Sequence, residues 1–251
     1  MSYHIAVAGK GGTGKTTFSA MLIKYLLNKG RRPILAVDAD PNANLGEALG
    51  VEPETTIADL IAETQDRLEP LPGGMAKETY IEYRLQAALA ESKDVDLLVM
   101  GGPEGAGCYC YPNNLLRKYM ERLHTNYPYV VMDNEAGLEH LSRRTTNDVD
   151  LLIVVSDPTV RGVRSAGRIN ELVDGIKLNV KRRFLIVSKA TGEPEGALAE
   201  EISKTGLPLA GILPLDPAVT EYDFNGRPLI ELPGDAPVAK AVTQILDQIL
   251  V

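Results

Sequence analysis

The residues best suited to chemistry lie near the start of the chain, which reads GKGGTGKTT at positions 9–17. The spacing of its glycines, lysine and threonine matches the pattern G-x-x-x-x-G-K-[ST], directly after an apolar run and at the start of a helical one. In such a loop the backbone N–H groups face nucleotide phosphates, Lys15 adds positive charge, and the Thr16 hydroxyl can ligate Mg²⁺. A chance glycine-rich turn is the alternative. The residues expected to hold the nucleotide here are Gly11, Gly12, Thr13, Gly14, Lys15, Thr16 and Thr17.

Aspartates end two further apolar runs and could complete such a site. Asp38 and Asp40 lie in the sequence VDADPNANL, and Asp133 ends the run YVVMD before DNEAG. A carboxylate at position 133 can hold a Mg²⁺-bound water, and a plain strand-to-turn aspartate is the alternative. An acidic residue at the spacing of Asp38 and Asp40 can instead meet a ribose, and Asp40 can also cap a following helix. The residue types alone leave these readings open.

The chain has two cysteines, Cys108 and Cys110, in the segment GGPEGAGCYCYP at 101–112. Because this segment follows an expected strand, it should lie at the same sheet edge as the phosphate loop. Two thiolates cannot complete a metal shell, but a two-fold dimer would bring four together, a set that suits tetrahedral Zn²⁺ or square-planar Ni²⁺. Buried structural cysteines and a redox pair are the alternatives, whereas the one-residue gap disfavours a structural disulfide.

The elements that must position these residues alternate along the chain. Apolar, β-branched runs typical of strands buried on both faces occupy 3–8, 33–38, 96–101, 129–133, 151–156, 184–188 and 209–213. Helices are predicted over 15–28, 111–127, 237–251 and near 160–177 and 193–204. This order predicts an α/β fold with a doubly wound, mostly parallel sheet. Because the Pro- and Gly-rich stretches 66–79 and 214–237 are predicted to be surface loops, we expect residues 1–251 to form a single P-loop domain.

The amino-acid composition disfavours some kinds of binding partner. The formal net charge of −8 disfavours binding to nucleic acid phosphates or anionic lipid, which depends on Lys and Arg. The start of the chain has no basic segment followed by an apolar one, and no run approaches the roughly 18 apolar residues of a membrane span. We therefore expect a cytoplasmic protein whose partners are neither nucleic acid nor membrane.

With Lys10 after its first glycine, the loop resembles the deviant Walker A P-loop of the MinD, ParA and nitrogenase iron-protein superfamily, which belongs to the SIMIBI class of P-loop NTPases. This resemblance implies ATP hydrolysis in a nucleotide-sandwich dimer, in which Lys10 reaches the partner's phosphates. A second cation there would offset charge in the transition state, and a solvated lysine is the alternative. The resemblance also implies that Asp40 orients the attacking water, that Asp38 lies near Mg²⁺, and that Asp133 belongs to the Walker B and switch II element.

The segments expected to bind the nucleotide base resemble this superfamily less closely than the phosphate loop does. The segment GILPLDP at 211–217, which includes Pro214, resembles the loop that closes over adenine in these ATPases. Family members usually carry an Asn-Lys pair after the sixth strand, whereas this chain has Ser188 and Lys189. Nothing resembles the NKxD guanine signature, so the resemblance favours ATP over GTP.

Several segments together look like the CooC-type ATPases, the nickel-insertion factors for carbon monoxide dehydrogenase, and like the related AcsF proteins. These segments are the phosphate loop, the DxDP sequence at 38–41, PEGAGCYCYPNNLL at 103–116 and DNEAGLEHL at 133–141. The match extends from the first strand to about Arg144. It implies a CxC site for Ni²⁺ or Zn²⁺ shared across a homodimer, coupling between nucleotide and metal, and a nickel enzyme apoprotein as partner.

Two other function classes compete with this metallochaperone reading. A nitrogenase-iron-protein-like reductase also has a cysteine after a GGPE sequence, but it needs a second one in switch II, where this chain reads DNEAG. A MinD- or ParA-like positioning ATPase would expose a membrane or DNA surface on dimerisation. The acidic charge and the single lysine of the last predicted helix count against that class.

Overall fold

The computed structural model describes residues 2–66, 77–101, 119–121, 123, 125–135, 148–176 and 178–250. Their strands form an eight-stranded sheet in the order β3-β4-β2-β5-β1-β6-β7-β8. Neighbouring strands are parallel except β3 and β4. The predicted doubly wound, mostly parallel sheet is therefore confirmed. The strands are β1 (Tyr3–Ala8), β2 (Ile34–Ala39), β3 (Leu89–Ala90), β4 (Val95–Val99), β5 (Tyr129–Asn134), β6 (Asp148–Ser156), β7 (Asn179–Ala190) and β8 (Leu209–Pro214).

The central strands are continuous apolar runs because helices cover both faces of the sheet. Every residue of β2 is buried, and β1 is buried from Ile5 to Ala8. Strand β1 lies between β5 and β6, and the chain crosses from it toward β2 on one side and later toward β6 on the other. In such sheets, ligands bind outside the carboxyl ends of the strands near this reversal of strand order. The fold therefore places the end of β1 at the expected binding crevice.

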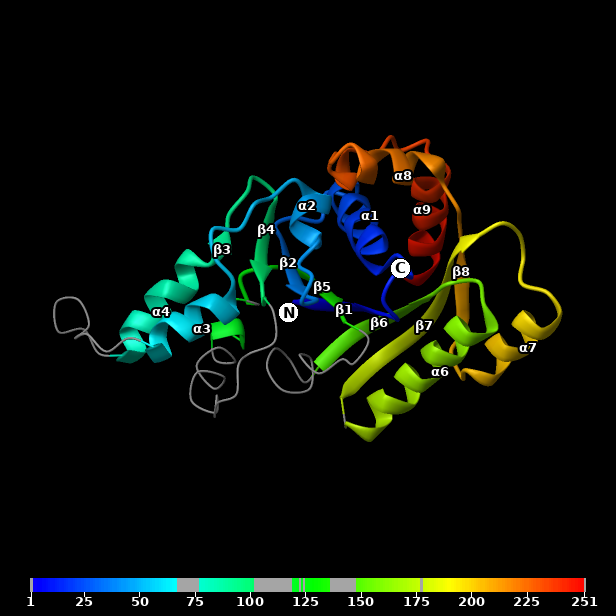
Figure 1. Ribbon diagram of the computed structural model, residues 1–251, viewed down its shortest axis with the longest axis horizontal. Coiled ribbons are helices and arrows are strands. Elements are labelled where there is room, and N and C mark those ends of the chain that lie inside the picture. The colour runs from blue at the N-terminus through cyan, green and yellow to red at the C-terminus, as the bar shows by residue number, and fades with distance from the viewer. Residues whose placement is uncertain are drawn as a thin grey trace.

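Helices pack on both faces of the sheet (Figure 1). One hydrophobic cluster joins a face of the sheet to α1, α2 and α9, and the other joins the opposite face to α3, α4 and α6. The helices are α1 (Lys15–Asn28), α2 (Leu45–Leu49), α3 (Ile57–Asp66), α4 (Lys77–Ala87), α6 (Val160–Gly175), α7 (Gly196–Lys204), α8 (Pro217–Phe224), the 3-10 helix η3 (Leu229–Glu231) and α9 (Pro237–Ile249).

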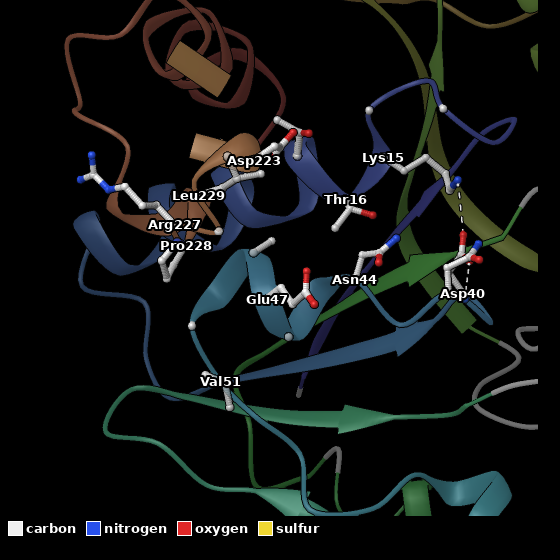
Figure 2. A pocket seen from close by; sticks show the side chains of 18 of the residues that line it. Lys15, Thr16, Asp40, Asn44, Glu47, Val51, Asp223, Arg227, Pro228 and Leu229 are labelled. Carbon is white, nitrogen blue, oxygen red and sulfur yellow. Dashed lines mark hydrogen bonds and ion pairs between the residues drawn. The ribbon is translucent and has the colours of Figure 1, made fainter. Parts of the chain in front are cut away.

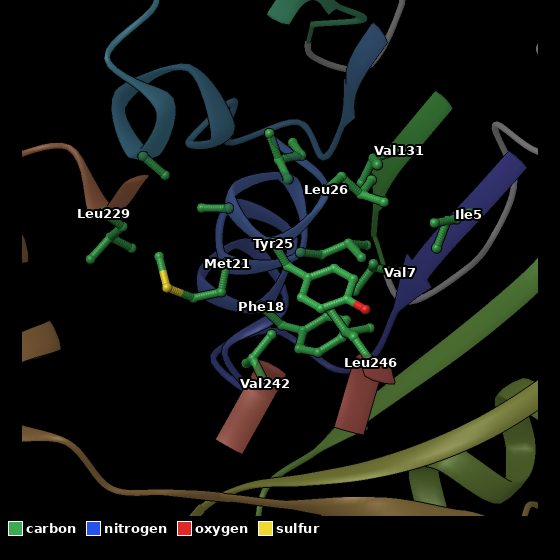
Figure 3. Close-up of a cluster of buried hydrophobic side chains, with 14 of the residues drawn as sticks. Ile5, Val7, Phe18, Met21, Tyr25, Leu26, Val131, Leu229, Val242 and Leu246 are labelled. Atoms are coloured by element: carbon green, nitrogen blue, oxygen red, sulfur yellow. The ribbon is translucent and has the colours of Figure 1, made fainter. Parts of the chain in front are cut away.

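Helix α1 lies at the centre of the first cluster. Figure 3 shows Phe18 of this helix near Val7 of β1 and near Val242 and Leu246 of α9. At the other end of the helix, the Tyr25 hydroxyl donates a hydrogen bond of 2.7 Å to Asp247 of α9. The first strand and the last helix of the chain thus hold the helix that begins at Lys15.

The structure corrects the predicted surface loop at 214–237, whereas most of the predicted loop at 66–79 lies outside the described residues. Helix α4 begins at Lys77, inside the stretch 66–79, and α8 and η3 occupy much of 214–237. Helix α8 was missed because the segment is rich in proline. Pro217, however, stands at a first helical position, which tolerates proline. The carboxylate of Asp216 caps this helix by accepting the Ala218 N–H at 3.0 Å. The predicted helix at 111–127 lies largely outside the described residues, and among those described no helix is long and apolar enough to cross a membrane.

Candidate functional site

The phosphate loop connects the end of β1 to α1 in a conformation that needs its glycines. A Cβ atom on Gly9 would lie 2.2 Å from the Val155 carbonyl oxygen of β6, so only glycine fits there. Gly14 has a φ of 89° and forms the N-cap of α1. This left-handed conformation directs the chain into the helix, whose free N–H groups and dipole favour an anion. The predicted strand, loop and helix thus make a phosphate cradle.

The end of β7 supports this loop from behind. The buried Ser188 hydroxyl donates a hydrogen bond to the Thr13 carbonyl, and the Lys189 ammonium donates one to the Gly12 carbonyl at 2.7 Å. Lys189 adopts a φ of 56°, a left-handed conformation that is costly for a residue with a side chain. The Ser-Lys pair that replaces the usual Asn-Lys pair therefore fixes two successive carbonyls of the loop.

Lys15 and Asp40 face each other across the loop. The Lys15 Nζ lies 3.6 Å from the Asp40 Oδ2, with the side chains 6% and 16% exposed. Asp40 also accepts hydrogen bonds from both the backbone and the side-chain nitrogen of Asn42. The sheet edge thus brings together two residues that the sequence places far apart.

Asp133 lies beside the first turn of α1. In the sheet it pairs in register with Val7 and Asp38. The Thr16 hydroxyl donates to the Asp133 Oδ2 at 2.7 Å, while the Oδ1 is buried without a hydrogen-bond partner among the described residues. Burial raises the pKa of Asp133 to about 7, against the lowering effect of the Thr16 bond.

The unsatisfied oxygen of Asp133 fits the Mg²⁺ ion that a P-loop nucleotide carries. A hydroxyl and a carboxylate are the hard oxygen donors that Mg²⁺ prefers, usually with several waters retained. A cation there would also stabilise the charged form of the buried carboxylate. Thr16 and Asp133 are therefore the residues expected to hold the ion, directly or through water.

Asp38 occupies a different environment. Its side chain is fully buried, and its two oxygens accept the backbone N–H groups of Asp40 at 3.1 Å and of Leu45 at 2.8 Å. Burial raises the pKa of Asp38 to about 6, whereas the two backbone hydrogen bonds lower it. Both carboxylate oxygens are thus engaged by the loop that follows β2.

A cavity of about 1020 Å³ extends from the phosphate loop between α2 and the segment that joins α8 to η3 (Figure 2). Asn44 and Glu47 line one side, and Asp223 and Arg227 line the other. These residues could not be identified from the sequence because nothing in their spacing points to a ligand. In the described part of the chain, Pro214 is not among the lining residues, and it ends β8 opposite Ala190.

The other nucleotide residues predicted from the sequence are divided between the cavity and its rim. Gly11, Gly12 and Thr17 line it together with Gly14, Lys15 and Thr16, whereas Thr13 is buried behind the loop. The Lys10 side chain is exposed. Cys108 and Cys110 lie outside the described residues, and the residues that are described contain no group of three or more His, Cys, Asp or Glu side chains that could hold a metal.

A parallel strand, a glycine-rich loop and a helix starting at a buried lysine, with carboxylates on the adjacent strands, define a P-loop nucleotide hydrolase. The sequence matches the family described as the CobQ/CobB/MinD/ParA nucleotide binding domain over residues 4–229, and the chain belongs to this family. It is an ATP-binding and ATP-hydrolysing protein, as the resemblance of its phosphate loop to the deviant Walker A loops implied.

Comparison with individual proteins supports this assignment. The chain is 45% identical over 248 residues to an uncharacterized ATP-binding protein of Methanocaldococcus jannaschii, covering 98% of each. It is 32% identical over 240 residues to the carbon monoxide dehydrogenase accessory protein CooC of Rhodospirillum rubrum, covering 91% of this chain and 89% of that one. The septum site-determining protein MinD of Pyrococcus horikoshii, complexed with Mg-ADP, shares the fold with a TM-score of 0.70, at 21% identity over 99% of this chain and 96% of that one.

Proposed function

We propose that this ATPase is a maturation factor that inserts nickel into a carbon monoxide dehydrogenase. The observation that carries the proposal is the similarity to CooC over nine-tenths of the chain, which exceeds the fold-level likeness to MinD structures. The sequence adds Cys108 and Cys110, a pair of soft ligands suited to Ni²⁺ or Zn²⁺.

The proposed metal site belongs to a homodimer. One chain supplies two thiolates, and a two-fold axis would bring Cys108 and Cys110 of both chains together in a closed four-sulfur shell. Any state that favours the dimer then raises metal affinity, and by linkage metal favours the dimer. ATP binding between the chains is the event that closes the pair, and hydrolysis resets it.

In this cycle the described residues have separate tasks. Lys15 and the loop amides bind the phosphates, and Thr16 and Asp133 hold the Mg²⁺ ion that offsets phosphate charge. Asp40 orients the attacking water, and Lys10 reaches the phosphates held by the partner. The energy of hydrolysis is thereby tied to opening the cysteine site.

A metal titration tests the shared site. Wild type, Cys108→Ser and Cys110→Ser are titrated with Ni²⁺ and with Zn²⁺ without nucleotide, with ADP and with ATP, and sedimentation is recorded at each point. We expect one metal per dimer in wild type, tighter binding with ATP, and loss of the site in either variant while ATP binding persists. One metal per monomer, or unchanged binding in either variant, would overturn the shared site.

A reconstitution assay tests the target. Nickel-free carbon monoxide dehydrogenase is incubated with limiting Ni²⁺, ATP and either wild type or the Cys108→Ser variant. We expect faster activation with wild type only, and no gain when ADP replaces ATP. Activation at the same rate without the protein would contradict the proposed target.

A MinD-like positioning role is the competing function, because relatives include the septum site-determining protein MinD of Helicobacter pylori at 26% identity over 254 residues. The apolar side chains of α9, among them Val242 and Leu246, are buried against α1 and the sheet. That face is therefore committed to the core. Cosedimentation with anionic vesicles in the presence of ATP separates the two functions, and we expect no binding.

A further inference from the structure

Asp38 holds both ends of the loop that carries Asp40. The N–H of Asp40 donates to one oxygen of the Asp38 carboxylate at 3.1 Å, and the N–H of Leu45 donates to the other at 2.8 Å. Residues 40–45 therefore form a loop that begins and ends on one buried side chain. Hydrogen bonds to a charged acceptor are about twice as strong as neutral ones, so the Asp38 carboxylate holds this loop firmly.

The loop has hydrogen bonds of its own between Asp40 and Asn42, but the helix that follows it has no side-chain cap from its own N-cap residue. Helix α2 is five residues long, and its N-cap, Asn44, makes no side-chain hydrogen bond to the helix. Asp38 supplies that cap from the preceding strand. Within the loop, Ala43 adopts a φ of 52°, a conformation that L residues with side chains avoid.

By holding this loop, Asp38 fixes the position of Asp40, the candidate catalytic carboxylate. Asp40 lies 3.6 Å from the Lys15 ammonium, and Asn44 follows it on the same side of the cavity (Figure 2). The Thr16 hydroxyl contacts Asp133. The carboxylate of the candidate ion-binding pair, Asp133, is thus a different residue from the loop anchor, Asp38.

We propose that Asp38 is a positioning residue for ATP hydrolysis, which fixes residues 40–45 so that Asp40 reaches the attacking water. It acts through Asp40 and not through Mg²⁺. This role concerns the ATPase reaction and is independent of the metal that the cysteines bind.

The chain contains a matched control for the anchor. The half-buried Asp96 of β4 accepts the N–H of Ser92 at 2.9 Å with one oxygen and the Tyr127 hydroxyl at 2.5 Å with the other. Asp96→Asn therefore also removes a carboxylate that accepts two hydrogen bonds, as Asp38→Asn does. It does so away from Asp40, among residues that the cavity lining does not include.

The experiment measures steady-state ATP hydrolysis of the full chain in wild type, Asp38→Asn and Asp96→Asn across a range of Mg²⁺ concentrations. We expect Asp38→Asn to lower kcat by ~10- to 100-fold, because small misplacements of a reacting group have effects of this size. The KM for ATP, the affinity for a fluorescent ADP analogue and the half-saturating Mg²⁺ concentration should stay near wild type. Asp96→Asn should lower Tm by a similar amount and keep its kcat.

A double-mutant cycle tests whether Asp38 acts through Asp40. If Asp38 works through Asp40, then adding Asp38→Asn to Asp40→Ala should have little further effect on turnover. Effects of the two substitutions that multiply, recovery of kcat at high Mg²⁺, or an equal loss of kcat in Asp96→Asn would each overturn the proposal. Thermal unfolding is measured first. If Asp38→Asn does not fold, the milder Asp38→Ser takes its place, and failure of both to fold would assign Asp38 to stability alone and refute the positioning role.

Discussion

The carboxylate of Asp40 competes with the nucleotide phosphates for the ammonium group of Lys15. Their ion pair of 3.6 Å lies where a β- or γ-phosphate belongs, so the lysine must change partner when ATP binds. At the scale of single residues, the site thus contains a carboxylate that opposes phosphate binding and a lysine that promotes it. The two effects are separable because each belongs to one side chain.

Asp40→Ala should lower kcat by about 100-fold or more, since orienting the water matters only on the way to the transition state. ATP affinity should stay equal or rise, because Lys15 loses its competing partner. Equilibrium binding of ATP and single-turnover hydrolysis measure the two quantities. Lys15→Ala is the contrasting variant, with ATP binding weakened by about tenfold or more, and equal losses of binding and turnover in Asp40→Ala would contradict the assigned role.

His4, at the start of β1, gives a pH dependence away from the nucleotide. Burial lowers the pKa of His4 below its ordinary value of 6.5, against the opposing effects of the Asp148 carbonyl and the Asp150 charge. The unfolded chain therefore binds this proton more readily between the lowered pKa and 6.5, so the free energy of unfolding should rise with pH across that window. Urea unfolding at pH 5.5 and 7.5 should show a larger rise in wild type than in His4→Asn. Equal rises would contradict this.

The elements differ in how far their own sequences determine them. Apart from the two-residue β3, which was missed, the strands and α1 could be predicted because they are long and apolar, and their ends place Lys15, Asp40 and Asp133 at one sheet edge. Helix α2 could not be predicted, because its cap comes from Asp38 on another element. The cavity lining at Glu47 and Asp223 could not be found either, since only the packing of α2 and α8 beside α1 brings these carboxylates to one cavity.

Strand β7 supports the phosphate loop through Ser188, and its removal should weaken nucleotide binding. Ser188→Ala leaves the Thr13 carbonyl without this donor, and a net loss of about 0.5–1.5 kcal/mol corresponds to a roughly 2- to 10-fold higher Kd for ATP and ADP alike. Calorimetry or a fluorescent nucleotide measures it. Ser165→Ala is the control, because that exposed hydroxyl bonds only within α6, to the Arg161 carbonyl. A Kd unchanged in Ser188→Ala would show that the loop holds its shape without β7.

At the scale of the whole molecule, the nucleotide site of one chain faces outward. The cavity opens at the sheet edge, and Lys10 is exposed there. In the part of the chain that the structure describes, Lys10 does not line the cavity of its own chain. Its charge is thus available to a second molecule, which is the arrangement that the nucleotide-sandwich dimer requires.

Turnover per chain should therefore rise with protein concentration and then level off as dimers form. Lys10→Ala should lower the plateau by about tenfold or more, since a cation at the transferred phosphoryl group stabilises the transition state, and ADP binding should persist. Hydrolysis rates over a dilution series, with sedimentation in ATP, measure this. Lys93→Ala, at another exposed lysine, is the control. Rates per chain that do not depend on concentration would contradict hydrolysis by a dimer.

The packing of α9 against α1 has a consequence for how the protein is made. Phe18 and Tyr25 leave the ribosome long before the groups they pack against or bond to, which are Val242, Leu246 and Asp247. Contacts between residues so far apart in sequence form late and slow the folding of a domain. A nascent chain that ends before Pro237 lacks this cover over the helix that bears the phosphate-binding lysine. The nucleotide site, although it begins at residue 9, is therefore completed only after α9 has been synthesised.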